Sequence, residues 1–205
     1  MILVLATANR DKGEEIRSIL GRSELQLSLL SEYPHIVLPP ETGLTYQENA
    51  AIKATTAASG IHEWALGDDS GLEIAALDGA PGIYSARFAG ENVGYTDNRK
   101  KVLDLLGNAP REKRGAKFVC TIALSDPTGK VRIIAEGICE GEIAPFETGD
   151  GGFGYDPIFY LPQYGKTFAA LTPDEKNQVS HRGKAIRKAV EMLYREINEF
   201  TPPTQ

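Results

Sequence analysis

The segment Ala65-Leu66-Gly67-Asp68-Asp69-Ser70-Gly71-Leu72 decides how the rest of the chain is interpreted. A short apolar lead runs into two adjacent carboxylates, a hydroxyl and a glycine that can adopt backbone angles other residues avoid. This order is typical of a strand end that delivers acidic side chains to the edge of an open α/β sheet, where such sheets bind ligands. Because Asp, Ser and Gly are also the commonest turn residues, a solvated turn over 68–71 is the alternative.

Two adjacent aspartates predict a cation site. Burying both in the ionised form is costly unless a cation lies near them. Magnesium is usually held by one or two carboxylates, with waters and substrate phosphates completing its shell. Asp68 and Asp69 are therefore candidate ligands for a hard divalent ion. Successive side chains of a strand point to opposite faces, so sharing one ion would need a bend between them.

The composition is that of an ordinary globular protein and excludes several function classes. The 205 residues are 41% hydrophobic and 24% charged, and a chain of this length can bury roughly 70% of its unfolded surface in one domain. The net charge of −6 argues against broad nucleic-acid binding, which needs clustered Lys and Arg. No window approaches a membrane span, and the apolar run 2–6 is too short for a signal peptide. We therefore expect a single cytoplasmic domain over 1–205 that binds neither nucleic acid nor membrane.

The two cysteines, Cys120 and Cys139, each lie alone in an apolar segment. They form no C-x-x-C pair and have no histidine nearby at a metal-ligand spacing. We interpret both as reduced core residues, because a buried free cysteine packs as a small hydrophobe.

Strands and helices alternate along the chain. The apolar run 2–6 predicts a buried strand, residues 7–12 form a polar loop, and apolar residues at helical spacing follow. Strands or extended segments are expected at 25–30 and 36–38, a hairpin from 117–124 and 130–136, and a further sheet segment at 138–146. Helices are expected at 45–59 and 97–106, and a capping box at 172–175 begins another. The last helix has an apolar stripe formed by Ile186, Ala189, Val190, Leu193 and Ile197. This interleaving predicts one α/β domain with a mixed sheet, bent into two lobes around a cleft, and a frayed tail at 201–205.

The loop 7–12 and helix 45–59 carry polar residues with two interpretations each. The loop would place its amides and Lys12 at a helix N-terminus, where phosphate binds readily. It lacks the spacing of a Walker loop, and ordinary helix capping is the alternative. Lys53 shares a helix face with Asn49, four residues earlier, and by default a helical lysine is solvated.

The segment 148–157 combines glycines and a proline with two aromatic residues. Aromatic side chains on such a loop suit stacking on a base, which is worth ~1–3 kcal/mol per base in single-stranded complexes. The alternative is that the rings of Phe153 and Tyr155 fill the core.

Seven motifs follow one another along nearly the whole chain. They are Thr7-Ala8-Asn9-Arg10-Asp11-Lys12, Glu41-Thr42-Gly43, Glu48-Asn49-Ala50 with Lys53, Asp68-Asp69-Ser70-Gly71-Leu72, Gly79-Ala80-Pro81-Gly82-Ile83-Tyr84-Ser85-Ala86-Arg87, Gly151-Gly152-Phe153-Gly154-Tyr155-Asp156-Pro157 and Ser180-His181-Arg182-Gly183. Together, and in this order, they closely resemble the inosine/xanthosine triphosphate pyrophosphatases. One small departure is Ala8, where many members have glycine.

The resemblance implies a fold and an activity. The fold is an elongated mixed β-sheet flanked by helices, with two lobes and a deep active-site cleft, usually in a homodimer. The activity is Mg²⁺-dependent hydrolysis of non-standard purine nucleoside triphosphates (ITP, dITP and XTP) to the nucleoside monophosphate and pyrophosphate. It removes these nucleotides from the pool before they enter DNA or RNA.

The resemblance also implies the roles of individual residues. Asp69 would be the catalytic carboxylate, and Lys12 and Lys53 would be catalytic cations on the phosphates, which replaces the solvated interpretation of Lys53. The metal residues would be Glu41, Asp68 and Asp69, holding Mg²⁺. The substrate contacts would be Thr7, Ala8, Asn9, Arg10, Asp11, Lys12, Ser70, Phe153, Gly154, Tyr155, Asp156, Lys176, His181 and Arg182, with Phe153 stacked on the purine.

Base selection follows from hydrogen bonding. Hypoxanthine and xanthine carry an O6 acceptor where adenine has an amino donor, so donors such as His181, Arg182 or Lys176 would reject adenine. Guanine also has O6, and the sequence does not show how it is excluded.

Two other functions stay open: a pyrophosphatase of similar fold that acts on modified pyrimidines or methylated bases, and a non-catalytic sensor that binds such a triphosphate without hydrolysing it. The intact Asp68-Asp69 pair and Lys12 argue against the sensor.

Overall fold

The computed structural model describes residues 1–21 and 23–200. The chain divides into two units, each assembled from separate stretches of sequence. Unit 1 comprises Met1–Asp69, Cys120–Gly137 and the described residues from Arg182 onward, and unit 2 comprises Ser70–Val119 and Ile138–His181. The predicted tail 201–205 lies outside the described residues. The two lobes and the cleft implied by the resemblance stay a prediction.

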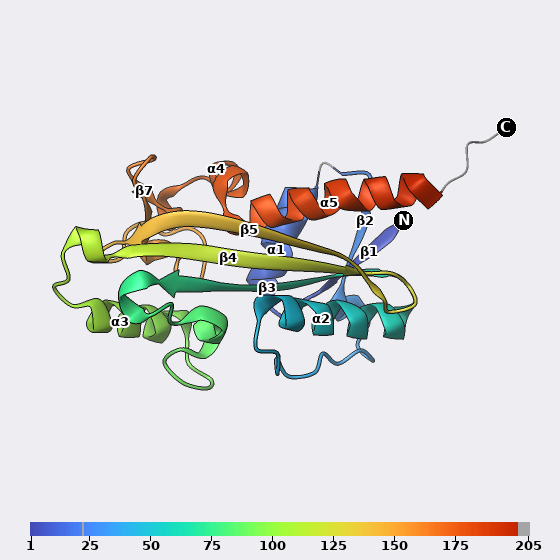
Figure 1. The fold of residues 1–205 in the computed structure, drawn as a ribbon, viewed down its shortest axis with the longest axis horizontal. Coiled ribbons are helices and arrows are strands. Elements are labelled where there is room, and N and C mark those ends of the chain that lie inside the picture. The colour runs from blue at the N-terminus through green and yellow to red at the C-terminus, as the bar shows by residue number, and fades with distance from the viewer. Residues whose placement is uncertain (22, 201–205) are drawn as a thin grey trace. The chain divides into compact units, whose positions relative to one another are not determined.

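The strands form a mixed sheet with the order β2-β1-β3-β4-β5-β6-β7 (Figure 1). Their bounds are β1 (Ile2–Ala6), β2 (Gln26–Leu29), β3 (Trp64–Ile74), β4 (Gly115–Ser125), β5 (Val131–Ile143), β6 (Phe159–Leu161) and β7 (Lys166–Thr167). β1 pairs in parallel with β2 and β3, whereas β6 is antiparallel to β5 and β7. The predicted α/β class with a mixed sheet is confirmed.

Several of the helices begin at a capping side chain. The α-helices of the described residues are α1 (Arg10–Leu20), α2 (Tyr46–Ile61), α3 (Tyr95–Leu106), α4 (Pro173–Val179) and α5 (His181–Phe200), and 3-10 helices lie at Leu30–Glu32, Ala75–Leu77, Gly82–Arg87, Arg111–Lys113, Asp156–Ile158 and Phe168–Ala170. Thr45 caps α2, and the predicted capping box of Thr172 and Glu175 begins α4. None of the helices in the described part of the chain is long and apolar enough to cross a membrane.

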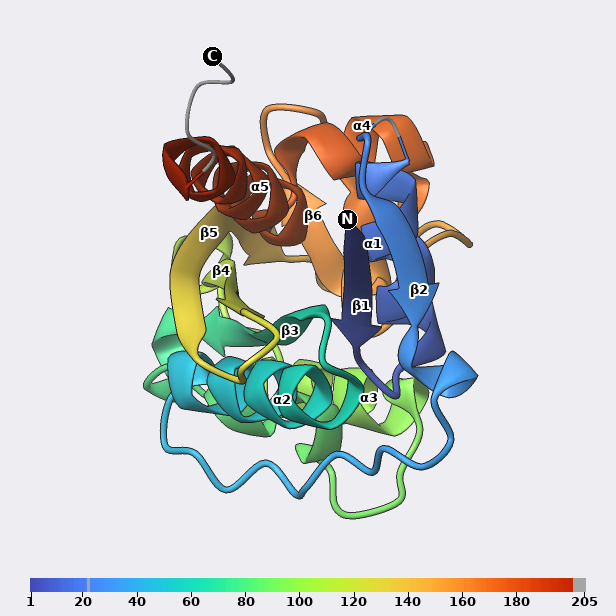
Figure 2. The same ribbon diagram turned by 90° about the vertical axis from the view of Figure 1, so that its right-hand side faces the viewer.

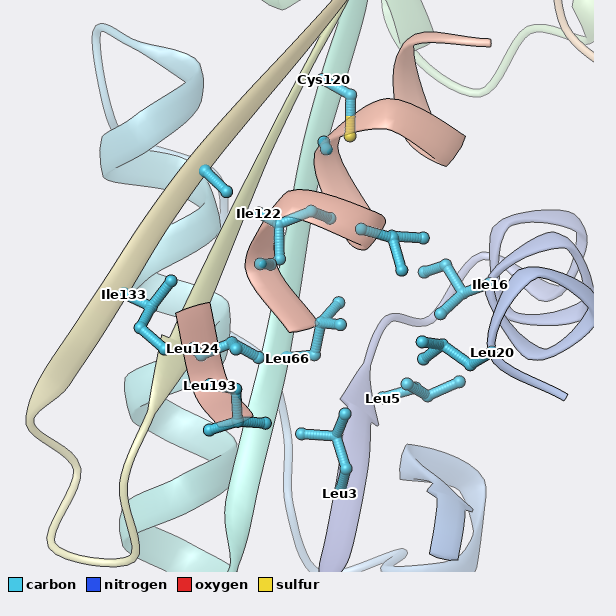
Figure 3. Packing of buried hydrophobic residues seen from close by; sticks show 14 residues of the cluster. Leu3, Leu5, Ile16, Leu20, Leu66, Cys120, Ile122, Leu124, Ile133 and Leu193 are labelled. Atoms are coloured by element: carbon cyan, nitrogen blue, oxygen red, sulfur yellow. The ribbon is translucent and has the colours of Figure 1, made fainter. Parts of the chain in front are cut away.

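In unit 1, helices cover both faces of the strands (Figure 2). Alternate residues of β1 point to opposite faces: Leu3 and Leu5 pack with α1 and α5, whereas Val4 and Ala6 pack with α2. Figure 3 shows the first of these cores, in which strand side chains meet those of α1 and α5. The predicted stripe of α5 faces this core: Ile186, Ala189 and Leu193 are buried, and Val190 and Ile197 pack against them.

Unit 2 has its own core, which is rich in aromatic residues. The Phe118 ring lies 4.6 Å from the Phe159 ring and 5.8 Å from the Phe168 ring, measured between centroids. Cys139 belongs to this core and Cys120 to the core of unit 1; both are buried and reduced, as the sequence predicts.

The structure corrects several element boundaries. Residues 36–38 are not a strand, and 138–143 continue β5 instead of forming a separate segment. The hairpin of β4 and β5 is confirmed, with the Asp126 amide bonded to the Lys130 carbonyl at 2.9 Å. The polar loop 7–12 ends early, because Asn9 caps α1 and the helix begins at Arg10.

Candidate active site

The site is built on the middle of β3. The expected strand end at Asp68 is wrong, since β3 has neighbours on both sides in the sheet and continues to Ile74. The solvated-turn alternative is also wrong, because Asp68 is 1% exposed and Asp69 is 5% exposed. Without a bend, alternation along the strand sends the two carboxylates to opposite faces, and their bonding partners differ accordingly.

Asp69 lies on the face of β3 that α2 covers. Its Oδ1 accepts a hydrogen bond from Lys53 Nζ at 3.2 Å, and its Oδ2 accepts one from Asn49 Nδ2, also at 3.2 Å. Lys53 Nζ also donates to Glu41 Oε1 at 2.7 Å, which brings Glu41 beside Asp69. Burial raises the pKa of Asp69 above its ordinary value, against the opposing effect of Lys53 and Lys12. The default interpretation of Lys53 as a solvated residue is wrong, since its side chain is 8% exposed and pairs with Asp69. Its role on the phosphates stays a prediction.

Asp68 lies on the opposite face, which α1 and α5 cover. Lys12 Nζ pairs with Asp68 Oδ1 at 2.6 Å, and Oδ2 accepts hydrogen bonds from Arg182 Nε at 3.1 Å and from the Cys120 thiol at 3.0 Å. Arg182 also pairs with Glu15 of α1. Burial alone would raise the pKa of Asp68, but Arg182 and Lys12 together hold it well below its ordinary value. The ionised form of Asp68 is thus stabilised by cations of the protein itself.

The segment before α1 uses its polar groups to begin the helix. Asn9 Oδ1 accepts the Lys12 amide at 3.1 Å, and the Asn9 amide donates to Thr7 Oγ1 at 3.2 Å. The capping interpretation of this segment is therefore confirmed, and its role in phosphate binding stays a prediction. Residues 7–10 also line a groove of about 710 Å³ together with residues of the segment 29–36.

Unit 2 brings together a second group of predicted site residues. Lys176 Nζ of α4 pairs with Asp156 Oδ2 at 2.6 Å and lies 4.7 Å from the centroid of the Phe153 ring. The same Asp156 oxygen accepts the Phe153 amide at 2.8 Å. Asp156 thereby connects the segment 148–157 to α4, and the Lys176 ammonium group lies beside the half-buried ring of Phe153.

The remaining predicted residues of unit 2 divide between core and loop. The Tyr155 hydroxyl donates to the Ser85 carbonyl at 2.8 Å and its ring belongs to the core, so the core interpretation holds for this residue. His181 is 3% exposed and stacks on Phe118, with 4.5 Å between ring centroids. The Gly154 carbonyl accepts a hydrogen bond from Arg99 at 2.9 Å.

The remaining residues predicted to contact substrate differ in how exposed they are. Arg10 has an 89% exposed side chain and pairs with Glu14 at 2.8 Å, whereas Arg182 is 2% exposed. Ala8 is exposed, and Asp11 and Ser70 are half-buried. The roles of all these residues stay predictions.

Sequence reasoning gave no role to two buried site residues. Asn49, which bonds Asp69, stands in a family motif and shares a helix face with Lys53, but neither observation assigned it a role. Glu15, which pairs with Arg182, follows Lys12 by three residues and so shares its helix face, a spacing that could have indicated it.

The acidic residues fit magnesium only in part. Within 1–21 and 23–200 no group of three or more Asp, Glu, His or Cys side chains is arranged to hold a metal ion. Glu41 and Asp69 converge on Lys53, while Asp68 points to the other face. Magnesium takes one or two carboxylates from a protein, and the carboxylates of Glu41 and Asp69 both bond the single ammonium group of Lys53. Glu41 and Asp69 therefore suit the ion, and the geometry gives no support for Asp68 as a third ligand.

Known proteins are similar to this chain in sequence and in fold. The family model described as the Ham1 family matches residues 3–192. A dITP/XTP pyrophosphatase of Desulforamulus reducens is 49% identical over 95% of this chain and 96% of its own length, and one of Rhodopirellula baltica is 45% identical over 95% and 94%. The solved structure of a HAM1 protein from Coxiella burnetii has a TM-score of 0.84 at 42% identity and covers 95% of this chain and 99% of that one. The chain belongs to the Ham1 family, and the resemblance on which the sequence predictions depend is confirmed.

Proposed function

We propose that this chain is a Mg²⁺-dependent pyrophosphatase that hydrolyses ITP, dITP and XTP to the nucleoside monophosphate and pyrophosphate. One observation carries the proposal: the buried Asp69, held by Lys53 and Asn49 beside Glu41. Ham1-family relatives named dITP/XTP pyrophosphatase support the same conclusion, because they match this chain over nearly its whole length.

Asp69 acts as the general base. An aspartate with a pKa near its ordinary value is ionised at neutral pH and can accept the proton of an attacking water. The upward shift that burial gives to the pKa of Asp69 makes the carboxylate a better proton acceptor. Lys53 and Asn49 leave it little freedom to turn, so water meets a carboxylate of fixed orientation.

Lys12 and Lys53 stabilise the negative charge that builds up on the phosphate oxygens. Each already pairs with a carboxylate, Lys12 with Asp68 and Lys53 with Asp69, so the ammonium groups are held in place before a substrate arrives. When bound, Mg²⁺ supplies Lewis-acid polarisation of the phosphoryl oxygens. Glu41 and Asp69 are the residues that would hold it.

Base selection belongs to Lys176, Asp156 and Phe153. Phe153 offers a half-buried ring for stacking, and the neighbouring Lys176 ammonium is a donor for O6. Arg182 is a poor candidate for this donor, since its guanidinium pairs with two carboxylates, those of Asp68 and Glu15.

A product assay tests the proposal. The chain is incubated with Mg²⁺ and, separately, ITP, dITP, XTP, GTP, ATP and a pyrimidine triphosphate, and pyrophosphate is measured apart from orthophosphate. We expect pyrophosphate from the first three. The O6 donor should lower kcat/KM for ATP by at least about 100-fold, and the family resemblance implies that GTP is also a poor substrate. Orthophosphate as the product would mean attack at the γ-phosphorus and would overturn the reaction. Tight binding of ITP without turnover would favour the sensor, and preference for a modified pyrimidine would favour the other pyrophosphatase.

A homodimer and a cytoplasmic location are further parts of the proposal, carried over from the family resemblance. Sedimentation equilibrium of the purified chain tests the first, with a mass close to twice 22.2 kDa expected. A mass that stays at the monomer value at micromolar concentration would contradict it.

A further inference from the structure

The first turn of α2 contains a buried side chain to which the proposed function assigns no chemistry. Asn49 is 1% exposed and is hydrogen-bonded at both ends of its amide. A buried amide is tolerated only when its polar atoms find partners. The identity of the two partners therefore indicates what Asn49 does.

The donor end of Asn49 fixes the orientation of Asp69. The last torsion of an aspartate is soft, so a single hydrogen bond leaves the carboxylate free to swing. Asn49 Nδ2 bonds Oδ2 and Lys53 Nζ bonds Oδ1, each at 3.2 Å. Asn49 and Lys53 are one helical turn apart, so one face of α2 holds both oxygens.

The acceptor end holds the loop that carries Glu41. Asn49 Oδ1 accepts the Gly43 amide at 2.8 Å, two residues after Glu41. A Cβ at Gly43 would lie 2.6 Å from this oxygen, so the close approach needs a glycine there. Lys53 binds the Glu41 carboxylate at 2.7 Å, and the loop is therefore attached to α2 at two points.

The close packing of α2 on β3 brings Asn49 within reach of Asp69. Gly67 faces the helix, on the same side of β3 as Asp69. A Cβ at Gly67 would lie 2.1 Å from the Ala50 carbonyl oxygen and 2.8 Å from the Ala54 amide nitrogen. The absence of a side chain at Gly67 thus lets the helix approach the strand closely, beside the pair Asn49 and Asp69.

We infer that Asn49 is a positioning residue for the proposed hydrolysis: its amide orients the Asp69 carboxylate and, at its other end, holds the Glu41 loop in register with it. The first part, the orienting of Asp69, deepens the proposed function and rests on it. The anchoring of the loop is a separate consequence that can be measured without substrate.

Two substitutions separate the two ends of the amide. Asn49→Ala removes both hydrogen bonds, whereas the isosteric Asn49→Asp replaces the donor to Asp69 with a carboxylate that repels it and keeps an acceptor for the Gly43 amide. Thr55→Ala is the matched control: it lies on the same helix and loses a polar contact to Ser125 at 3.4 Å, away from Asp69. The readouts are kcat and KM for ITP hydrolysis with Mg²⁺, and hydrogen exchange of the Gly43 amide by NMR without substrate.

Asn49→Ala is expected to lower kcat about 10- to 100-fold with KM changed less than about threefold, because a misplaced catalytic group lowers turnover more than binding. Its Gly43 amide should exchange at least about tenfold faster. Asn49→Asp should also lose turnover but keep Gly43 protected, and Thr55→Ala should match the parent chain in both. Parent-like kcat in both Asn49 variants would overturn the orienting role, and unchanged Gly43 exchange in Asn49→Ala would overturn the anchoring role. If the parent chain releases no pyrophosphate, the proposed function and the orienting role fail together, and Gly43 exchange still decides the anchoring role.

Discussion

Asp68 and Asp69 are neighbours in the chain, but the structure places them in opposite electrostatic environments. The cations around Asp68 hold its pKa well below the ordinary value, whereas the pKa of Asp69 is raised by burial. Asp68 is paired with Lys12 and Arg182, whereas Asp69 shares Lys53 with a second carboxylate, Glu41. The first arrangement suits a residue that holds cations in place, and the second suits a proton acceptor and metal ligand.

Asp69→Asn is expected to lower kcat for ITP by about 10²–10⁴-fold, the range that a general base contributes. The fold should persist, because asparagine fills the same space and removes a charge whose burial is unfavourable. Steady-state kinetics and chemical denaturation measure the two effects. Glu73→Gln, on the same strand but outside the candidate site, is the control and should keep parent kcat. Near-normal turnover by Asp69→Asn would show that another group activates the water.

Arg182→Met is expected to destabilise the protein by about 3–5 kcal/mol, because it leaves Asp68 and Glu15 as buried carboxylates without this partner. The control is Arg195→Met on the same helix, where the pair with Glu191 is exposed and should contribute less than about 1 kcal/mol. Urea unfolding of both variants gives the comparison. Equal stability losses would mean that the buried pair does not hold α5 in place.

The sequence predicted the direction of the two adjacent acidic side chains better than the partners they contact. The alternation of strand side chains implied that Asp68 and Asp69 face opposite ways, and the structure agrees. The partner of Arg182 could not be inferred, because pairing with Asp68 joins residues 114 positions apart. Only the packing of α5 on the strands creates that contact.

At the scale of elements, α2 is placed by small residues. Ala50, Ala54, Ala57 and Ala58 are buried against the strands, and Gly67 lies directly under the helix. Short side chains allow the backbones of helix and strand to come close, as they do wherever small residues line a packing surface. The alanine-rich composition predicted the helix, but it did not indicate how closely the helix would pack.

Gly67→Ala tests this packing. The added methyl group would lie 2.1 Å from the Ala50 carbonyl oxygen, so the helix must shift. Overpacking of this kind costs about 1–3 kcal/mol, and the shift should carry Asn49 and Lys53 away from Asp69 and reduce kcat. Thermal unfolding and ITP turnover measure both effects. Gly115→Ala is the control, because a Cβ at Gly115 meets nothing within 4 Å; similar losses in both variants would contradict the packing argument.

Predictions of helices were confirmed where the pattern lies within one helix. Predictions of strand ends were wrong where pairing with neighbouring strands determines how far a strand extends. The apolar stripe of α5 and the capping box of α4 are both confirmed, because each is set by residues within one helix. The expected end of β3 at Asp68 was wrong because the turn propensity of Asp, Ser and Gly is weaker than pairing with strands on both sides. The same effect extended β5 through 138–143.

For the whole molecule, three strands supply residues to both units. β3, β4 and β5 each begin in one unit and end in the other. A strand that loses its neighbours in one unit loses part of the ladder that orders it in the other. We therefore expect the two units to unfold in a single cooperative transition.

The two thiols provide a probe of that cooperativity, since buried Cys120 belongs to the core of unit 1 and buried Cys139 to the core of unit 2. Neither should react with a thiol reagent in the native protein, and both should react in denaturant. Pulsed alkylation across a urea series, with each cysteine peptide quantified by mass spectrometry, gives one unfolding midpoint per unit. Coincident midpoints are expected, because no unit can lose its part of β3, β4 and β5 alone. Midpoints that differ by more than about 1 M urea, which is roughly 1–3 kcal/mol for a small protein, would show instead that the units unfold independently and that the shared strands do not couple them.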